Sequence, residues 1–156
     1  MARLVSLGLR TLCLATLLAG SAFVAQAADI GINDPYARAV PPGQPNSAVF
    51  MTLTNHDKAE RALVGAESQA AATVELHTHV AEQGMMVMRR IERIALPAGK
   101  PVELKPGGLH VMLIGLEQRL EPGAEVALTL VYDDGSTASV VAPVRQIAPP
   151  AMPHAK

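Results

Sequence analysis

The sequence predicts one all-β domain, built as a β-sandwich or a small Greek-key barrel. Short apolar segments recur at intervals of about ten residues, a spacing typical of all-β proteins. Gly, Pro and Asx residues separate these segments. In addition, no segment has an apolar stripe of helical period that starts at a capping residue. A helical layer is therefore not expected.

Eight segments have the character of strands, because each is short, rich in apolar side chains and bounded by turn residues. The linking sequences NHDK, EQG, PAGK, KPGG, LEPG and DDGS all contain residues that favour turns. A further turn is expected at 68–73, and no internal repeat or second domain is visible. In chain order, the expected strands are 47–55, 61–68, 73–80, 85–96, 101–105, 110–116, 125–132 and 137–144.

The start of the chain, 1–27, has the pattern of a signal peptide. Arg3 and Arg10 accompany a short apolar run that ends in Ala25-Gln26-Ala27, as at a cleavage site. The run is shorter than the roughly 20 apolar residues of a membrane span, which disfavours an uncleaved anchor. We therefore expect export to the periplasm, a mature domain at 28–145, and a mobile tail at 146–156.

The composition excludes several classes of protein. Without residues 1–27 the chain has 11 basic and 14 acidic side chains, hence a net charge of −3 with neutral histidine. An acidic chain that lacks tryptophan and a basic stripe is not expected to bind nucleic acid. The single cysteine, Cys13, lies in the signal segment. A blue-copper electron-transfer site requires a thiolate, so it is excluded for the mature protein.

Histidine and methionine occur together on the predicted strands. His110 and Met112 point to one face of their strand, because residues two apart share a side. Glu75, His77 and His79 share a face on the strand 73–80 in the same way. A lone histidine on a strand is usually a hydrogen-bonded surface residue, and a lone methionine usually fills a gap in the core. Their conjunction on several strands instead suggests a site.

The strand after 73–80 contributes more methionine. Only AEQG separates the two strands, which predicts an antiparallel hairpin around Gly84. The expected pairing sets His77 opposite Met88 and His79 opposite Met86, unless a bulge at Gly84 shifts it.

Imidazole and thioether donors together favour a soft metal ion. Thioethers discriminate against magnesium and calcium, and Cu(I) is the ion that suits this combination best. These ligands are neutral, so the bound ion keeps its positive charge and is held less firmly. Such a site is better suited to delivery than to permanent storage.

The spacing of four residues resembles the signature of a known family. His77, Met88, His110 and Met112 follow the pattern H-x10-M-x21-H-x-M, which is that of the periplasmic copper chaperones called PCuAC. The stretches VELKPGGLHVMLIGL and VALTLVYDDGSTASVVAPV also resemble that family. The likeness extends over nearly the whole mature chain.

The resemblance implies a cupredoxin-like β-barrel that carries one Cu(I) at an exposed rim. Matched position by position, the ligands would be His77, Met88, His110 and Met112. The implied role is delivery of copper to the CuA centre of cytochrome oxidase, directly or with a Sco-type thiol protein. We expect a monomer without enzymatic activity that, once mature, is not embedded in a membrane.

Four more residues are candidate secondary ligands. His79 and Met86 neighbour the main set on the predicted hairpin. Met152 and His154 lie in the tail, where the imidazole could hold a second copper ion as Cu(II).

Three alternatives remain open at this point. A copper buffer or resistance protein would use the same site without a dedicated acceptor. A cupin-like metalloenzyme would use Glu75, His77 and His79, but thioether ligands have no place in its oxygen chemistry. In a secreted adhesion or scaffolding module, the His/Met spacing would be a coincidence.

Overall fold

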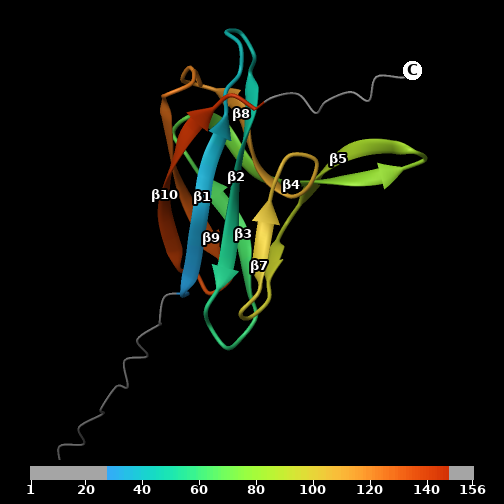
Figure 1. Cartoon of the computed structure of the whole chain (residues 1–156), viewed down its shortest axis with the longest axis vertical. Coiled ribbons are helices and arrows are strands. Elements are labelled where there is room, and N and C mark those ends of the chain that lie inside the picture. Colours follow the sequence, from blue (N-terminus) through green and yellow to red (C-terminus); the bar gives the residue numbers. More distant parts are fainter. Residues whose placement is uncertain (1–27, 148–156) are drawn as a thin grey trace, which may run out of the picture.

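Ten β-strands make up the part of the chain that this computed structural model describes, residues 28–147 (Figure 1). Within that range no helix is long and apolar enough to cross a membrane. The all-β prediction is confirmed. The strands are β1 (Ile30–Arg38), β2 (Asn46–Asn55), β3 (Arg61–Glu67), β4 (Ala71–Glu82), β5 (Met85–Ile91), β6 (Ile94–Leu96), β7 (Pro101–Leu104), β8 (His110–Leu116), β9 (Glu125–Tyr132) and β10 (Thr137–Arg145).

β1 is absent from the predicted strands, because its sequence IGINDPYAR is polar and contains a proline. The structure accommodates Pro35 by an irregularity. Asp34 has a φ of +45°, and the register with β2 shifts between Asn33 and Tyr36. A bulge of this kind is one of the few ways in which a strand admits proline.

The predicted strand 85–96 is in fact two strands. β5 pairs with β4, whereas β6 pairs with β3 on the other side of the domain. The chain crosses between the two halves of the fold at residues 92–93, and no Gly, Pro or Asx residue marks this crossing in the sequence.

The strands form one sheet in the order β5-β4-β8-β2-β1-β10-β9-β3-β6, and β7 pairs with β2 beyond the end of β8. The named strands pair antiparallel except for β1 and β10, which run parallel and join the two halves. β5-β4-β8-β2-β1 make one half and β10-β9-β3-β6 the other, in a cupredoxin-like arrangement.

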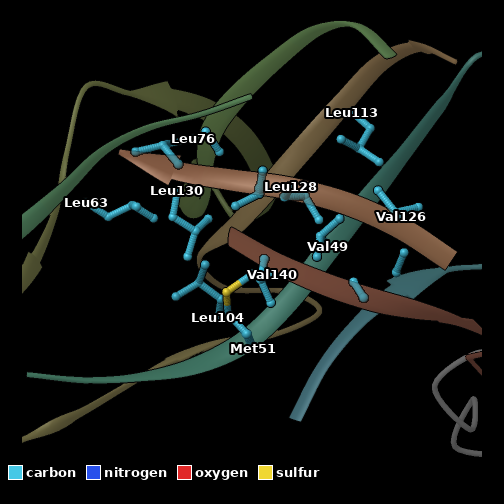
Figure 2. Close-up of a cluster of buried hydrophobic side chains, with 14 of the residues drawn as sticks. Val49, Met51, Leu63, Leu76, Leu104, Leu113, Val126, Leu128, Leu130 and Val140 are labelled. Carbon is cyan, nitrogen blue, oxygen red and sulfur yellow. The ribbon is translucent and has the colours of Figure 1, made fainter. Parts of the chain in front are cut away.

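The hydrophobic core lies between these halves (Figure 2). Val49 and Met51 of β2 and Leu113 of β8 are at most 1% exposed, and they belong to the same cluster as Leu128 of β9 and Val140 of β10. Met51 is thus an ordinary core residue. Since successive side chains of a strand point to opposite faces, the residues between these core positions lie on the outer face.

Candidate metal centre

The candidate metal site occupies the outer face of the half-sheet β5-β4-β8-β2-β1. On β8, Val111 and Leu113 are fully buried in the core, so His110 and Met112 point the other way. Leu76 of β4 is likewise buried in the core, so Glu75 and His77 on either side of it point to the outer face. Packing in the core therefore determines where the donor side chains emerge.

Strand pairing brings donors from distant parts of the sequence together. β4 and β8 are antiparallel neighbours, with His77 directly opposite His110 and Glu75 opposite Met112. Directly opposite residues have their Cβ atoms about 5 Å apart. His77, His110 and Met112 therefore belong to one patch, as the sequence predicts.

The predicted register of the β4–β5 hairpin is wrong by two residues. His79, not His77, lies opposite Met88, and Met86 lies opposite Ala81. The cause is the turn, in which only Gln83 and Gly84 connect the strands and both have positive φ, +50° and +81°. This is the two-residue type I′ geometry that fits the twist of a hairpin.

His110 is almost completely buried, at 2% exposure. Its Nδ1 lies 2.9 Å from the carbonyl oxygen of Gly108. A carbonyl only accepts hydrogen bonds, so Nδ1 carries the proton and donates it. Burial lowers the pKa of His110, and the neighbouring imidazoles lower it further, against a smaller opposing effect of the Gly108 hydrogen bond. The ring is thus neutral near pH 7, with its Nε2 lone pair available.

The turn before His110 positions that carbonyl. Gly107 has a φ of +78°, which a residue with a Cβ adopts only under strain. The turn is closed by a hydrogen bond from the Gly108 amide to the carbonyl of Lys105, at 3.0 Å. A glycine-rich turn therefore fixes the tautomer and direction of the adjacent histidine.

His77 is oriented by a carboxylate. Its Nε2 lies 2.8 Å from Oε2 of Glu75, and Arg90 on β5 approaches Oε1 of the same carboxylate at 3.4 Å. The hydrogen bond from His77 is the main reason that the pKa of Glu75 is lowered. Nδ1 of His77 is buried without a hydrogen-bond partner among the described residues. In the neutral ring that bonds Glu75 through Nε2–H, Nδ1 bears the lone pair.

A histidine bound to a metal usually donates its other N–H to a carboxylate or a carbonyl. His77 and His110 both have this arrangement, with Glu75 and the Gly108 carbonyl as the respective partners. A buried imidazole nitrogen without a partner is rare in proteins. The unpartnered Nδ1 of His77 is therefore the donor atom that this ring would offer to a metal ion.

His79 joins the other two imidazoles. The centroids of the His79 and His110 rings are 5.2 Å apart, and those of His77 and His110 are 5.8 Å apart. Nδ1 of His79 is 3.5 Å from the carbonyl oxygen of Gly108, a distance at the outer limit for a hydrogen bond.

A cavity of about 420 Å³ that is open to solvent lies at the donors, although His77 is not among the residues that line it. Met88 and Met112 line it together with His79 and His110. Met88 is 41% exposed, so one thioether is reachable from outside while His110 is not. Among residues 28–147, no three histidine or carboxylate side chains are already placed to hold one metal ion. In their present rotamers the imidazoles of this face therefore do not form a ready-made site of three nitrogens.

Two residues at this cavity belong to no sequence motif. The ring of Phe50 packs 6.2 Å from that of His110, between centroids, and the guanidinium carbon of Arg38 lies 5.7 Å from the Phe50 centroid. Both residues line the cavity. The sequence signal for Phe50 is its place between the core residues Val49 and Met51, which directs its side chain to the outer face.

The structure separates the secondary candidates. Met86 lies two residues nearer the hairpin tip than Met88 and is 62% exposed. It is not among the residues that line the cavity. Met85 is 65% exposed at the tip itself. Met152 and His154 lie outside the described residues, as does the signal segment 1–27.

Comparison with known proteins identifies the family of this chain. Residues 30–144 match the family model "Putative lipoprotein LpqE-like". A curated relative from Leifsonia xyli subsp. xyli, "Putative lipoprotein Lxx21020", is 34% identical over 124 residues, which are 79% of this chain and 74% of the relative.

Solved structures agree with this assignment. The solution structure of CuI-DR1885 from Deinococcus radiodurans is 36% identical, with a TM-score of 0.63 over 78% of this chain and 82% of that one. The copper-bound PCuAC domain from PmoF2 has a TM-score of 0.66 at 24% identity, over 78% of this chain and 97% of that domain, and so supports the fold. The chain therefore belongs to the LpqE-like family, which is the PCuAC family that its His/Met spacing resembles.

Proposed function

We propose that this protein is an extracytoplasmic copper carrier, which binds Cu(I) through His77, Met88, His110 and Met112 and passes it to an acceptor. The observation that carries this proposal is the gathering of imidazole and thioether donors on one outer face, at an open cavity. Neutral nitrogen and thioether sulfur together favour Cu(I) over hard cations.

The environment of the two histidines supports this choice of metal. His110 is neutral because it is buried, and Glu75 orients His77 so that a lone pair is free. Protons therefore compete only weakly for the free nitrogen of His110 at neutral pH. The relatives described as lipoproteins, and DR1885 solved with Cu(I), support an extracytoplasmic copper role. With the predicted signal peptide, they favour the periplasm.

Glu75 argues against the cupin-like enzyme. A carboxylate that already bonds both His77 and Arg90 orients a ligand and is a poor general base. Binding and transfer of the ion account for the site without a catalytic step.

The shape of the site supports transfer to another protein. The β4–β5 hairpin extends beyond the rest of the sheet (Figure 1), and Met88 on it is partly exposed. An acceptor could replace this thioether first, while the buried His110 still holds the ion. We propose the CuA-bearing subunit of cytochrome oxidase, or a Sco-type thiol protein, as that acceptor.

Cu(I) binding is tested by competition with a chromogenic Cu(I) chelator. Met88→Leu and Met112→Leu should each weaken Cu(I) binding at least about tenfold, which corresponds to about 1.4 kcal/mol. Met85→Leu is the matched control, because Met85 is exposed on the same hairpin but outside the cavity, and it should bind as the parent does. Unchanged affinity in both site variants would refute the proposed ligand set.

Delivery is tested separately, since a copper buffer would have the same site. The Cu(I)-loaded protein is mixed with an apo CuA domain or a reduced Sco-type protein, and copper in each is measured after separation. A carrier transfers copper faster than free chelated copper at the same buffered concentration. Equal rates would favour the buffer alternative while leaving Cu(I) binding intact.

A further inference from the structure

We propose that His79 is a third imidazole ligand of this site, and that it allows the same face to hold Cu(II) as well as Cu(I). The inference rests on the proposed copper site and adds a second binding mode to it. The juxtaposition that carries it is the cluster of three histidine rings, from β4 and β8, beside two thioethers.

The position of His79 is not that of a distant surface residue. His79 lines the cavity together with Met88, Met112 and His110. Its ring centroid is nearer to that of His110 than the His77 centroid is, 5.2 Å against 5.8 Å. It also lies directly opposite Met88 on the β4–β5 ladder.

The spacing of the rings is close to what a shared metal ion requires. A metal–nitrogen bond is about 2.0 Å and a ring nitrogen lies about 1.2 Å from the centroid, so two imidazoles on one ion have centroids about 4.5–5.5 Å apart. The observed 5.2 Å and 5.8 Å fall within about 1 Å of that range. The proposed site therefore requires the imidazole side chains to rotate until their nitrogens share one ion.

Rotation of the His79 side chain toward a metal ion would break only a weak hydrogen bond. Its Nδ1 approaches the Gly108 carbonyl oxygen at 3.5 Å, and that oxygen already accepts a hydrogen bond from His110 at 2.9 Å. A contact of that length contributes little. By contrast, His77 and His110 are each held in place by a short hydrogen bond.

Cu(I) and Cu(II) prefer different donor atoms. Cu(I) favours soft thioethers, whereas Cu(II) favours nitrogen and oxygen in tetragonal sites. His77, His79 and His110 supply three nitrogens for Cu(II), and Met88 and Met112 supply the sulfurs for Cu(I). Because His79 and Met88 face each other across one rung, with Cβ atoms about 5 Å apart, a small shift of the ion exchanges thioether for imidazole.

The experiment compares Cu(II) and Cu(I) binding in the full chain. A His154→Ala background removes the tail imidazole as a competing Cu(II) ligand. Two variants are made in it: His79→Gln, and His56→Gln as a control in an exposed turn outside the cavity. Cu(II) affinity is measured against a competing chelator, the nitrogen ligands are counted by electron paramagnetic resonance, and Cu(I) affinity is measured in parallel.

We expect the background protein to bind one Cu(II) with a spectrum of three nitrogens. His79→Gln should weaken Cu(II) binding at least tenfold and remove one nitrogen, while Cu(I) affinity changes less than threefold. His56→Gln should match the background. An unchanged Cu(II) spectrum in His79→Gln would overturn the proposal, and so would an equal loss of Cu(I) and Cu(II) binding. Absence of Cu(I) binding in the background protein would instead refute the proposed function.

Discussion

His79 lies directly opposite Met88 on the β4–β5 ladder, and His77 lies opposite Arg90. The first and second members of the H-x10-M spacing are thus diagonal neighbours, not a directly facing pair. The residue facing His77 from β5 is an arginine that approaches the Glu75 carboxylate, which in turn accepts a hydrogen bond from His77. The hairpin therefore supplies a candidate thioether ligand and also supports the orientation of a candidate imidazole ligand.

The orienting role of Glu75 gives the first prediction. Glu75→Gln removes the charge that fixes Nε2–H of His77, so Cu(I) binding should weaken by about tenfold, as is typical for such outer partners of metal ligands. Glu82→Gln is the matched control, since Glu82 is on the same strand and forms an ion pair with Arg89 at 2.6 Å. Neither residue lines the cavity. Cu(I) competition titration measures both. Equal affinity in the two variants would mean that Glu75 does not orient the ligand.

The second prediction concerns the pH dependence of the metal-free protein. Burial lowers the pKa of His110 below 6.5 in the folded state, so the unfolded chain binds a proton that the folded chain does not. Stability is then full above pH 6.5 and decreases as the pH falls from 6.5 toward the lowered pKa of the folded state.

Chemical unfolding of the apo protein between pH 7.5 and pH 5 measures this effect. His110→Asn removes the titrating group and should show a shallower dependence, even if it is less stable overall. The same slope in both proteins would assign the pH effect to other groups.

The third prediction uses a buried hydroxyl in the core. Tyr132 is 2% exposed, and its hydroxyl has no hydrogen-bond partner among the described residues. Its burial raises the pKa of Tyr132 to about 12. Tyr132→Phe removes the unsatisfied group and keeps the ring, so the free energy of unfolding should rise by about 1 kcal/mol. A clear loss of stability in urea unfolding would show that the hydroxyl is solvated or bonded.

The fourth prediction concerns the tail. A chain ending at Ile147 retains β10 and the ion pair between Arg145 and Asp34, whose Nη2 and Oδ1 are 2.8 Å apart. It should therefore bind one Cu(I) as tightly as the full chain does. Any additional Cu(II) bound through Met152 and His154 should disappear, which equilibrium dialysis with copper analysis measures. Loss of the Cu(I) site would mean that the domain extends beyond Ile147.

Much of the fold could be predicted because it depends on local patterns. The strand containing His110 and Met112 is bounded by turn residues and alternates cleanly between core and outer face. β1 could not be predicted, since Pro35 and polar neighbours conceal a strand that pairing with β2 and β10 stabilises. β5 and β6 were predicted as one strand, because only their pairing with different partners, β4 and β3, separates them.

The site was predictable in its composition and less so in its geometry. Fixed sequence gaps identify His77, Met88, His110 and Met112, but the hairpin register depends on the φ values of Gln83 and Gly84. The pairing of His77 with His110 joins strands 33 residues apart, and no local pattern specifies it. The contributions of Phe50 and Arg38 arise only when β2 pairs with β8 on one side and with β1 on the other.

The parallel pairing of β1 with β10 determines where the end of the domain lies. The Ala39 amide donates to the carbonyl of Arg145 at 2.8 Å, and Arg38 lies opposite Arg145 in the register. Arg38 and Ala39 line the copper cavity, so chain that continues past Arg145 starts at the rim of that cavity. A donor or acceptor module joined there by a short flexible linker would be held at a millimolar effective concentration. Fusion at this end therefore makes copper exchange intramolecular without any new contact surface.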